Sequence, residues 1–263
     1  MKELSALEII NKIRKKEQLN AVVKGGFMQI KITTYSPIIA IAMHGGSRVE
    51  REFVDILKPD YNEREISEES FTDFYINRLP IQLIMRDIKV LYDIEKPKSE
   101  CINVENLKKP LTSFQEKKLL KNYDTFYVIL KEIIDVLSKG ERRVHLYDVH
   151  STQQEQLITL QVPNHSALAI TNDLIKSFEN IDATLINKGI NVIEEKNEFI
   201  KKLAISHKKL SYLRIYVNEL YKGSGRNNYY IPMINRIRFM LTNGILEQHV
   251  EKVKEKNIRD NDE

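Results

Sequence analysis

The 263 residues of this chain, 42% of them hydrophobic and 30% charged, have the balance of a globular protein with a sizeable core. Basic and acidic residues (41 and 37, net charge +4) are interspersed, so no basic stripe predicts a nucleic-acid partner, and no apolar run approaches the roughly 20 residues of a membrane helix. The single cysteine, Cys101, excludes an intrachain disulfide and a thiolate-rich metal site; with no signal-peptide pattern at the N-terminus, we expect a cytoplasmic protein without a membrane partner.

Helices and strands are predicted to alternate along the chain. Apolar residues at helical spacing predict helices over 4–19, 113–137, 169–178 and 231–250, and shorter ones over 50–57 and from Thr72 or Asp73. Alternating or continuous apolar runs predict strands over 21–23, 28–32, 38–43, 81–84, 89–94, 144–151, 157–162, 186–193 and 213–218. Ser113 and Glu116 stand at capping-box spacing at the start of the longest helix, which Lys139-Gly140 ends.

This alternation predicts an α/β fold of three layers, with a central mixed, mostly parallel sheet flanked by helices. We expect a single domain over residues 1–263, in which a charged tail begins at about residue 252.

Residues 38–43 form the strand on which the functional prediction rests. Six consecutive apolar residues, too few for a buried helix, indicate a strand covered on both faces. The strand runs into His44-Gly45-Gly46 and so places an imidazole at the carboxyl edge of a sheet, where ligands bind in open α/β folds. The two glycines are expected to leave room for a ligand or a metal ion.

A second predicted strand, 144–149, also ends in a histidine, His150. If the two strands run the same way in one sheet, both imidazoles face the same edge, and two histidines with one carboxylate and an open position describe a catalytic zinc site. Such an ion lowers the pKa of bound water to about 7 and polarises a carbonyl group. Asp148 points to the same side as His150 and is the expected partner of a ligand imidazole's other nitrogen. We therefore predict one Zn²⁺ bound by His44 and His150.

The third metal ligand remains open at this point. Glu50 is the first carboxylate after His44, and Asp73 lies where a loop enters a helix; the two rank equally, with Glu52 behind them. Side chains of this kind are more often solvated surface charges than metal ligands.

The order of these motifs resembles the N-formylglutamate amidohydrolase family over residues 38–221. The matching segments are His44-Gly45-Gly46 and residues 72–79, 92–97, 147–151 and 215–221. The resemblance implies a zinc-carboxypeptidase/phosphorylase-hydrolase-like fold with one metal ion at the sheet edge, held by His44 and His150. It also implies hydrolysis of amide bonds in N-acylated or γ-linked glutamate-type substrates, so the expected partner is a small-molecule or peptide-like substrate with a carboxylate.

Three segments depart from the pattern of that family. Glu95 and Lys96 stand where the family usually has asparagine and arginine, so the bidentate clamp for a substrate carboxylate is lost and Glu95 adds repulsion. Tyr216 stands where the family has a general-base glutamate, and a phenol with a pKa of about 10 is a poor base at neutral pH. The charged residues 197–209 replace an expected glycine-rich turn with an arginine.

The sequence thus predicts a metal-dependent hydrolase that cleaves an amide bond, with Tyr216 and Glu219 as catalytic candidates, although Glu219 lies on the opposite strand face from Tyr216. Its candidate substrate-binding residues are Arg48, Arg86, Lys96 and Ser151. The departures favour an alternative, a diverged member without catalysis that binds a metal or ligand as a regulatory protein. A purely structural protein with two incidental histidines is the third possibility. The sequence does not predict an oligomeric state.

Overall fold

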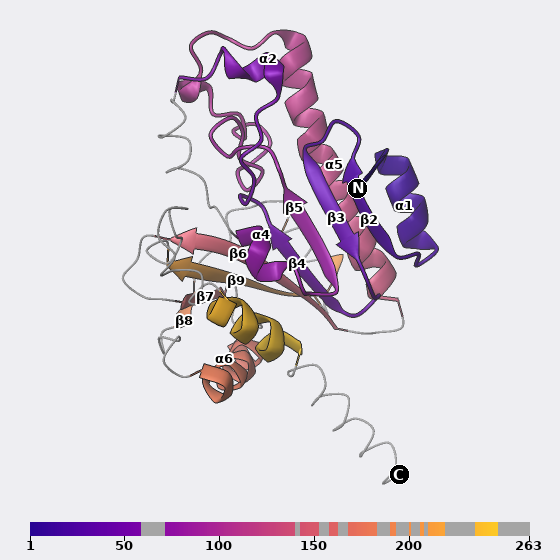
Figure 1. Ribbon diagram of the computed structural model, residues 1–263, viewed down its shortest axis with the longest axis vertical. Coiled ribbons are helices and arrows are strands. Elements are labelled where there is room, and N and C mark those ends of the chain that lie inside the picture. Colours follow the sequence, from indigo (N-terminus) through magenta and orange to yellow (C-terminus); the bar gives the residue numbers. More distant parts are fainter. Residues whose placement is uncertain are drawn as a thin grey trace.

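The computed structural model describes residues 1–58, 72–139, 143–152, 158–162, 168–182, 190–192, 200, 206–207, 210–218 and 235–246. The described strands form one sheet in the order β1-β2-β3-β5-β4-β6-β9-β7-β8 (Figure 1). They are β1 Lys2–Leu4, β2 Leu19–Val23, β3 Met28–Ile32, β4 Ile38–Ala42, β5 Ile81–Met85, β6 Val144–Thr152, β7 Ile158–Val162, β8 Ile190–Val192 and β9 Leu210–Asn218.

Helices cover both faces of this sheet. They are α1 Ala6–Arg14, α2 Arg51–Val54, α4 Thr72–Ile76, the short 3₁₀ helix η1 Val104–Asn106, α5 Ser113–Leu137 and α6 Leu168–Asp182, and residues 235–246 are helical too. Figure 1 shows this last helix beside α6. None of the described helices combines the length and apolar composition needed to cross a membrane.

The two strands that lead into the histidines are parallel neighbours, so the condition for both imidazoles to face one edge is met. β4 pairs with β6 in the register Ile41↔Asp148, and β6 pairs with β9 in the register His150↔Tyr216, both parallel. Five of the eight strand pairings are parallel, while β2–β3, β3–β5 and β7–β9 are antiparallel. The predicted α/β fold with a mixed, mostly parallel sheet is therefore confirmed.

The central strand β4 separates two hydrophobic cores. Ile39 and Ile41 pack into the core formed with α1 and α5, whereas Ile38, Ala40 and Ala42 pack into the core formed with α4, α6 and residues 235–246. All five residues of β4 are buried, because a strand in mid-sheet has a helical layer on each side.

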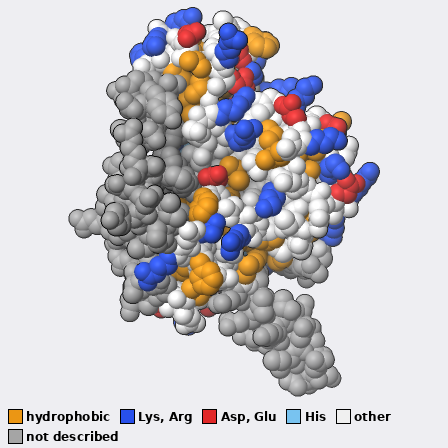
Figure 2. Space-filling model, viewed as in Figure 1, with side chains coloured by type: hydrophobic (Ala, Val, Ile, Leu, Met, Phe, Trp, Pro, Cys, Tyr) orange, Lys and Arg blue, Asp and Glu red, His pale blue; other side chains and the backbone are white. Residues whose placement is uncertain are grey.

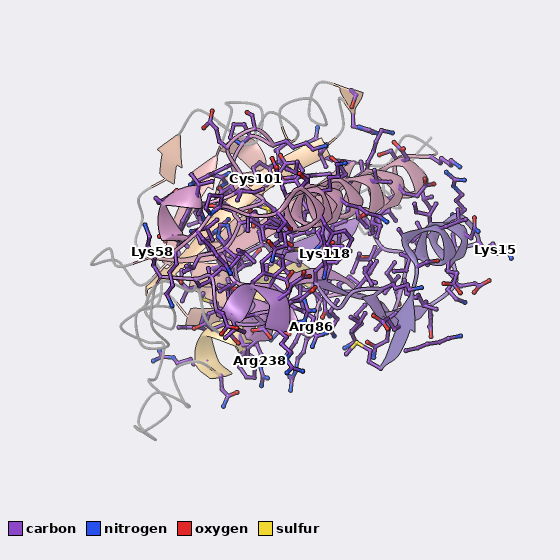
Figure 3. All side chains as sticks on the ribbon, turned by 90° about the horizontal axis from the view of Figure 1, so that it is seen from above. Lys15, Lys58, Arg86, Cys101, Lys118 and Arg238 are labelled. Atoms are coloured by element: carbon purple, nitrogen blue, oxygen red, sulfur yellow. The ribbon has the colours of Figure 1, made fainter. Side chains whose placement is uncertain are left out.

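Cys101, labelled in Figure 3, is also fully buried.

The predicted strand over 89–94 is wrong. This segment belongs to a folded connection between β5 and α5, in which Tyr92 forms only an isolated bridge with Ile102. The amide of Asp93 donates to the carbonyl of Cys101 at 2.7 Å, so the backbone is satisfied by a loop that folds back on itself. The apolar side chains that suggested a strand are buried in the core without a continuous ladder.

Other boundaries shift by a few residues. The capping box of α5 is formed by Thr112 and Gln115, one residue before the predicted pair Ser113 and Glu116, because both pairs have the same spacing. The predicted helix 4–19 is confined to α1, and the unpredicted strand β1 precedes it, pairing with β2 over three residues. The charged tail from about residue 252 lies outside the described residues.

Candidate metal centre

The His44-Gly45-Gly46 turn is held tightly against its neighbours. A Cβ atom on Gly46 would lie 2.2 Å from the backbone carbonyl of Arg86, and one on Gly45 would lie 2.7 Å from Oγ1 of Thr72. Both glycines are therefore needed for close packing of this chain segment onto protein. The expectation that they leave room for a ligand is corrected, because protein atoms fill that space.

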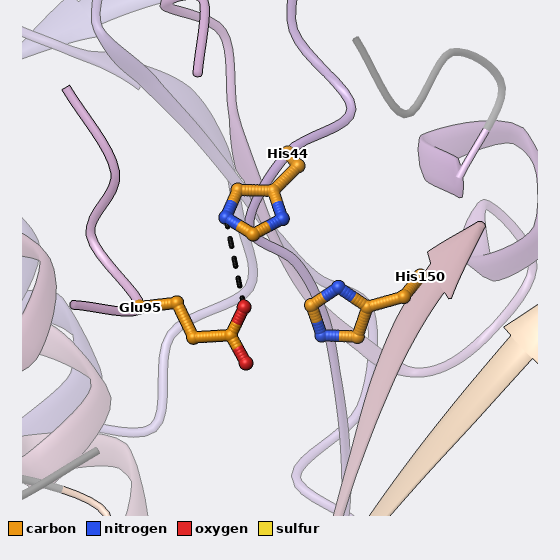
Figure 4. A group of neighbouring side chains, drawn as sticks. All are labelled: His44, Glu95 and His150. Carbon is orange, nitrogen blue, oxygen red and sulfur yellow. Dashed lines mark ion pairs between the residues drawn. The ribbon is translucent and has the colours of Figure 1, made fainter. Parts of the chain in front are cut away.

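Three side chains offer metal-binding atoms at the carboxyl edge of the parallel strands. The imidazoles of His44 and His150 are 1% exposed, and their ring centroids lie 5.3 Å apart. Glu95, in the connection after β5, completes the group, and one donor atom from each residue lies within 4.8 Å of the others (Figure 4). The ligands of a four-coordinate metal ion lie roughly 3.3 Å apart, so the three donor atoms would have to approach one another by no more than about 1.5 Å to hold one ion.

Each histidine has a carboxylate beside its Nε2 atom. His44 Nε2 donates to Oδ1 of Asp93 at 2.8 Å, and His150 Nε2 lies 2.8 Å from Oδ2 of Asp148. Burial raises the pKa of Asp93, but the charge and hydrogen bond of His44 lower it more, to about 2. Such carboxylates fix the tautomer and orientation of metal-binding imidazoles.

Glu95 is positioned from two sides. The phenol of Tyr127 on α5 donates to the carbonyl of Ile94 at 2.6 Å, and that of Tyr123 donates to the carbonyl of Lys96 at 3.1 Å. One carboxylate oxygen of Glu95, Oε2, lies 3.9 Å from His44 Nε2, while the other, Oε1, forms an ion pair with the guanidinium of Arg214. The two backbone hydrogen bonds hold this segment against α5, and the ion pair orients the carboxylate.

Arg214 joins Glu95 to the second histidine. Its Nε donates to the hydroxyl of Tyr212 at 2.8 Å, and that hydroxyl donates to Oδ2 of Asp148 at 2.7 Å. The described centre therefore holds three carboxylates, of Asp93, Glu95 and Asp148, and one guanidinium. With both imidazoles neutral, as binding to a metal ion requires, these formal charges sum to −2, which a divalent cation would balance.

Glu50 and Glu52, two of the expected third ligands, are engaged elsewhere. Glu50 forms ion pairs with Arg48 at 2.9 Å and with Lys118, and Lys118, which extends from α5 (Figure 3), also binds Glu52 at 2.5 Å. These contacts neutralise both carboxylates away from the donor group.

Asp73, the other expected ligand, lies beside the turn. Its amide nitrogen and Cβ lie 3.2 and 3.4 Å from the position of a Cβ on Gly45, one residue from His44. Burial raises the pKa of its carboxyl group. Its carboxylate is not among the three donors that the described residues gather, where Glu95 takes the third place.

The candidate substrate-binding cations bind protein groups. Arg48 pairs with Asp87 and donates to the carbonyl of Gly25 at 2.7 Å, and Arg86 donates to that of Gly26 at 3.2 Å. Both guanidinium groups are thus directed at the β2–β3 turn. Lys96 donates to Oδ1 of Asn103 at 2.6 Å, which keeps its ammonium on its own loop.

Of the remaining candidates, Tyr216 lies at the centre. Its ring stacks on that of His150 with centroids 5.1 Å apart and an interplanar angle of 22°, and burial raises the pKa of its phenol. The phenol therefore stays protonated at neutral pH and is no general base. Ser151 is buried in β6 and, by strand alternation, faces away from the side of His150. Glu219 lies outside the described residues.

The sequence interpretation missed Tyr212 and Arg214 as site residues and gave Asp93 and Glu95 no metal-related role. The alternation of residues along β9 contains a signal for Tyr212 and Arg214. Tyr212, Arg214 and Tyr216 alternate along β9, and the register places Arg214 beside Asp148. A polar stripe on the strand next to a histidine strand marks a buried polar site.

The chain was also compared with known proteins. No family model and no curated protein sequence matches it. Among solved structures, an N-formylglutamate amidohydrolase from Ralstonia eutropha JMP134 aligns with a TM-score of 0.64 at 12% identity, over 82% of this chain and 95% of that one. The chain shares its fold with an N-formylglutamate amidohydrolase.

Two further structures align with the chain. The gene product Atu2144 from Agrobacterium tumefaciens has a TM-score of 0.58 at 13% identity, over 84% of this chain and 95% of that one. A metallo-carboxypeptidase from Burkholderia cenocepacia has a TM-score of 0.39 at 10% identity, over 85% of this chain and 61% of that one. The predicted resemblance to the amidohydrolase is confirmed for the fold.

Proposed function

We propose that this protein is a metal-dependent hydrolase that cleaves the amide bond of an N-acylated or γ-linked amino-acid substrate. One observation carries the proposal: His44, Glu95 and His150 bring three donor atoms within 4.8 Å of one another, on a fold shared with an amidohydrolase. Two histidines and a carboxylate are a donor set of catalytic zinc sites. We therefore propose Zn²⁺ as the ion.

The ion and the protein residues have separate tasks. A bound Zn²⁺ supplies a Lewis acid that polarises a carbonyl oxygen and lowers the pKa of water to about 7. Asp93 holds the imidazole of His44 through a hydrogen bond to Nε2, and Asp148 places a carboxylate oxygen 2.8 Å from Nε2 of His150. Arg214 neutralises part of the charge on Glu95. The protonated phenol of Tyr216, next to His150, is placed to donate a hydrogen bond to a substrate oxygen or to the departing nitrogen.

The same phenol favours the alternative function, a metal-binding protein without hydrolysis. The resemblance to the amidohydrolase family would place a general-base glutamate at position 216, beside His150. Tyr216 stands there instead, and the pKa of its phenol is raised. The described carboxylates of the centre are already engaged with His44, Arg214 and Tyr212.

For the substrate we propose a small or peptide-like molecule with a carboxylate, in a cytoplasmic setting. Arg48, Arg86 and Lys96 would bind that carboxylate only after releasing their present partners on the protein. A cavity of about 830 Å³ lies elsewhere, between residues 98–111 and the first turns of α5, and none of the three donor residues lines it.

Elemental analysis of protein purified without chelator tests the proposal. We expect one zinc ion per chain and its loss in His150→Ala. His145→Ala is the matched control, because His145 is also buried in β6 but is not one of the donors, so it should retain the ion. Absence of metal from the native protein would refute the metal centre.

Activity assays then separate the two functions. Hydrolysis of N-formylglutamate, N-acetylglutamate or a γ-glutamyl amide that disappears in His150→Ala supports the hydrolase. Full metal occupancy without turnover of any such amide supports the non-catalytic alternative.

A further inference from the structure

The centre contains a cation of its own. Arg214 has a side chain only 9% exposed, pairs with Glu95 through Nη2, and places Nε 3.8 Å from Oδ2 of Asp148. A buried guanidinium is costly unless anions and hydrogen-bond acceptors surround it. These contacts show that Arg214 is built into the polar cluster rather than added at its rim.

The carboxylates need this cation when no metal is present. Asp93 and Asp148 are buried and Glu95 is partly buried, so their three formal negative charges repel more strongly than they would in water. Arg214 contacts one of them directly and lies close to a second. Arg214 therefore neutralises part of the negative charge that a divalent ion would balance.

A metal ion and Arg214 would meet at the same carboxylate. Glu95 presents Oε1 to the guanidinium, while Oε2 lies on the side of His44. An ion bound by Oε2 would share the carboxylate with a positive charge a few ångströms away. Because the two cations repel each other, the guanidinium reduces the gain from binding the ion.

We propose that Arg214 is an internal counter-ion that shares Glu95 with the metal. It keeps the metal-free pocket assembled and lowers the affinity of the pocket for a divalent cation, so the ion exchanges more readily than the donor set alone would allow. This inference rests on the metal binding in the proposed function. Arg214 is a positioning and charge-setting residue, since it acts through Glu95.

The experiment measures zinc affinity by competition with a chromophoric chelator, and thermal unfolding of the metal-free protein. Arg214→Gln keeps hydrogen-bonding capacity but removes the charge, and Arg214→Lys keeps the charge but loses the planar fork. We expect Arg214→Gln to bind zinc about tenfold tighter than the native protein and Arg214→Lys to stay within about threefold of it. Unchanged or weaker zinc binding by Arg214→Gln would overturn the proposal, because it would leave Arg214 with an orienting role alone.

The metal-free proteins provide an arm that does not depend on zinc. Arg214→Gln should lower the melting temperature because it removes the guanidinium that pairs with Glu95 and lies close to Asp148, and adding Glu95→Gln should restore part of the loss. A double variant whose loss equals the sum of the two single losses would refute the pairing. If the native protein binds no zinc, the proposed function fails, whereas restoration in the double variant still supports the counter-ion role.

Discussion

Asp87 offers a quantitative test of the charge balance near the glycine turn. Its carboxylate is 6% exposed, lies against the guanidinium of Arg48, and accepts from the hydroxyl of Tyr92 at 3.4 Å. Burial raises the pKa of Asp87, and Arg48 opposes this only in part, so the pKa reaches about 6 instead of 3.8. The substitution Asp87→Asn removes the titration and keeps the shape of the side chain.

The sign follows from proton binding. Because the pKa of Asp87 is higher in the folded than in the unfolded chain, the folded state binds more protons between about pH 4 and pH 6. The contribution to the free energy of unfolding is fully present below about pH 4 and is lost as the pH rises through 6. The gap between the two pKa values, about 2, corresponds to roughly 3 kcal/mol.

Urea denaturation of the native protein and of Asp87→Asn at several values between pH 4 and pH 7 measures this effect. The difference in unfolding free energy, native minus variant, should fall by about 2.4 kcal/mol between pH 4 and pH 7, because most of the titration lies in that range and the other carboxylates cancel in the subtraction. Asp124→Asn, which removes a half-exposed carboxylate paired with Lys98 at 2.7 Å, controls for the loss of one surface charge. A difference that stays constant to within about 0.5 kcal/mol from pH 4 to pH 7 would refute the reasoning.

Three further predictions concern the centre and its turn. Gly46→Ala should lower the free energy of unfolding in denaturant by about 3 kcal/mol, because the added Cβ would meet the backbone of Arg86. The control Gly25→Ala, at φ +96° with no atom within 4 Å of the added Cβ, should lose only about 1 kcal/mol. Equal losses in the two variants would contradict this reasoning. Zinc at about 100 times its dissociation constant should add about 2.7 kcal/mol to the unfolding free energy of the native protein and nothing to His150→Ala, as measured by calorimetry with and without chelator. Tyr216→Phe should retain its zinc and lose about tenfold or more in kcat if the phenol donates to the substrate, and unchanged kcat would exclude that role.

The sheet and the two histidines were within reach of the sequence because they follow from local periodicity. Six apolar residues before His44 indicate burial on both faces, and β4 does separate two cores. The alternation up to His150 indicates a second strand that ends in a histidine, and the structure places this strand parallel to β4 and next to it. Neither inference needs knowledge of contacts distant in the sequence.

The third donor, Glu95, could not be predicted because its position depends on contacts between residues distant in the sequence. Glu95 lies in a connection whose path is set by hydrogen bonds to Cys101 and to Tyr127 of α5, and no periodic pattern encodes these contacts. Glu50 is nearer to the histidine in sequence, but Lys118, 68 residues further along the chain, binds its carboxylate. Proximity in sequence says little about ligands that come from irregular loops.

The overall mixing of surface charges could be predicted from the sequence, but the partners of individual charges could not. On the face shown in Figure 2, basic side chains are dispersed and acidic side chains lie among them, in keeping with the interspersed sequence. The pairing of individual cations depends on tertiary contacts. The expected clamp residue Arg48 shows this, since it binds a backbone carbonyl of the β2–β3 turn.

The two tyrosines of α5 that hold the backbone on either side of Glu95 have a mechanical consequence. They attach an irregular loop to a 25-residue helix whose buried residues, from Leu119 to Leu137, are packed in the core, so the helix restricts the movement of the loop. Tyr127→Phe, far from any donor atom in sequence, would then loosen one ligand while leaving the two histidines on their strands. The position of Glu95 therefore depends on the contact between its loop and α5, a helix in another part of the chain.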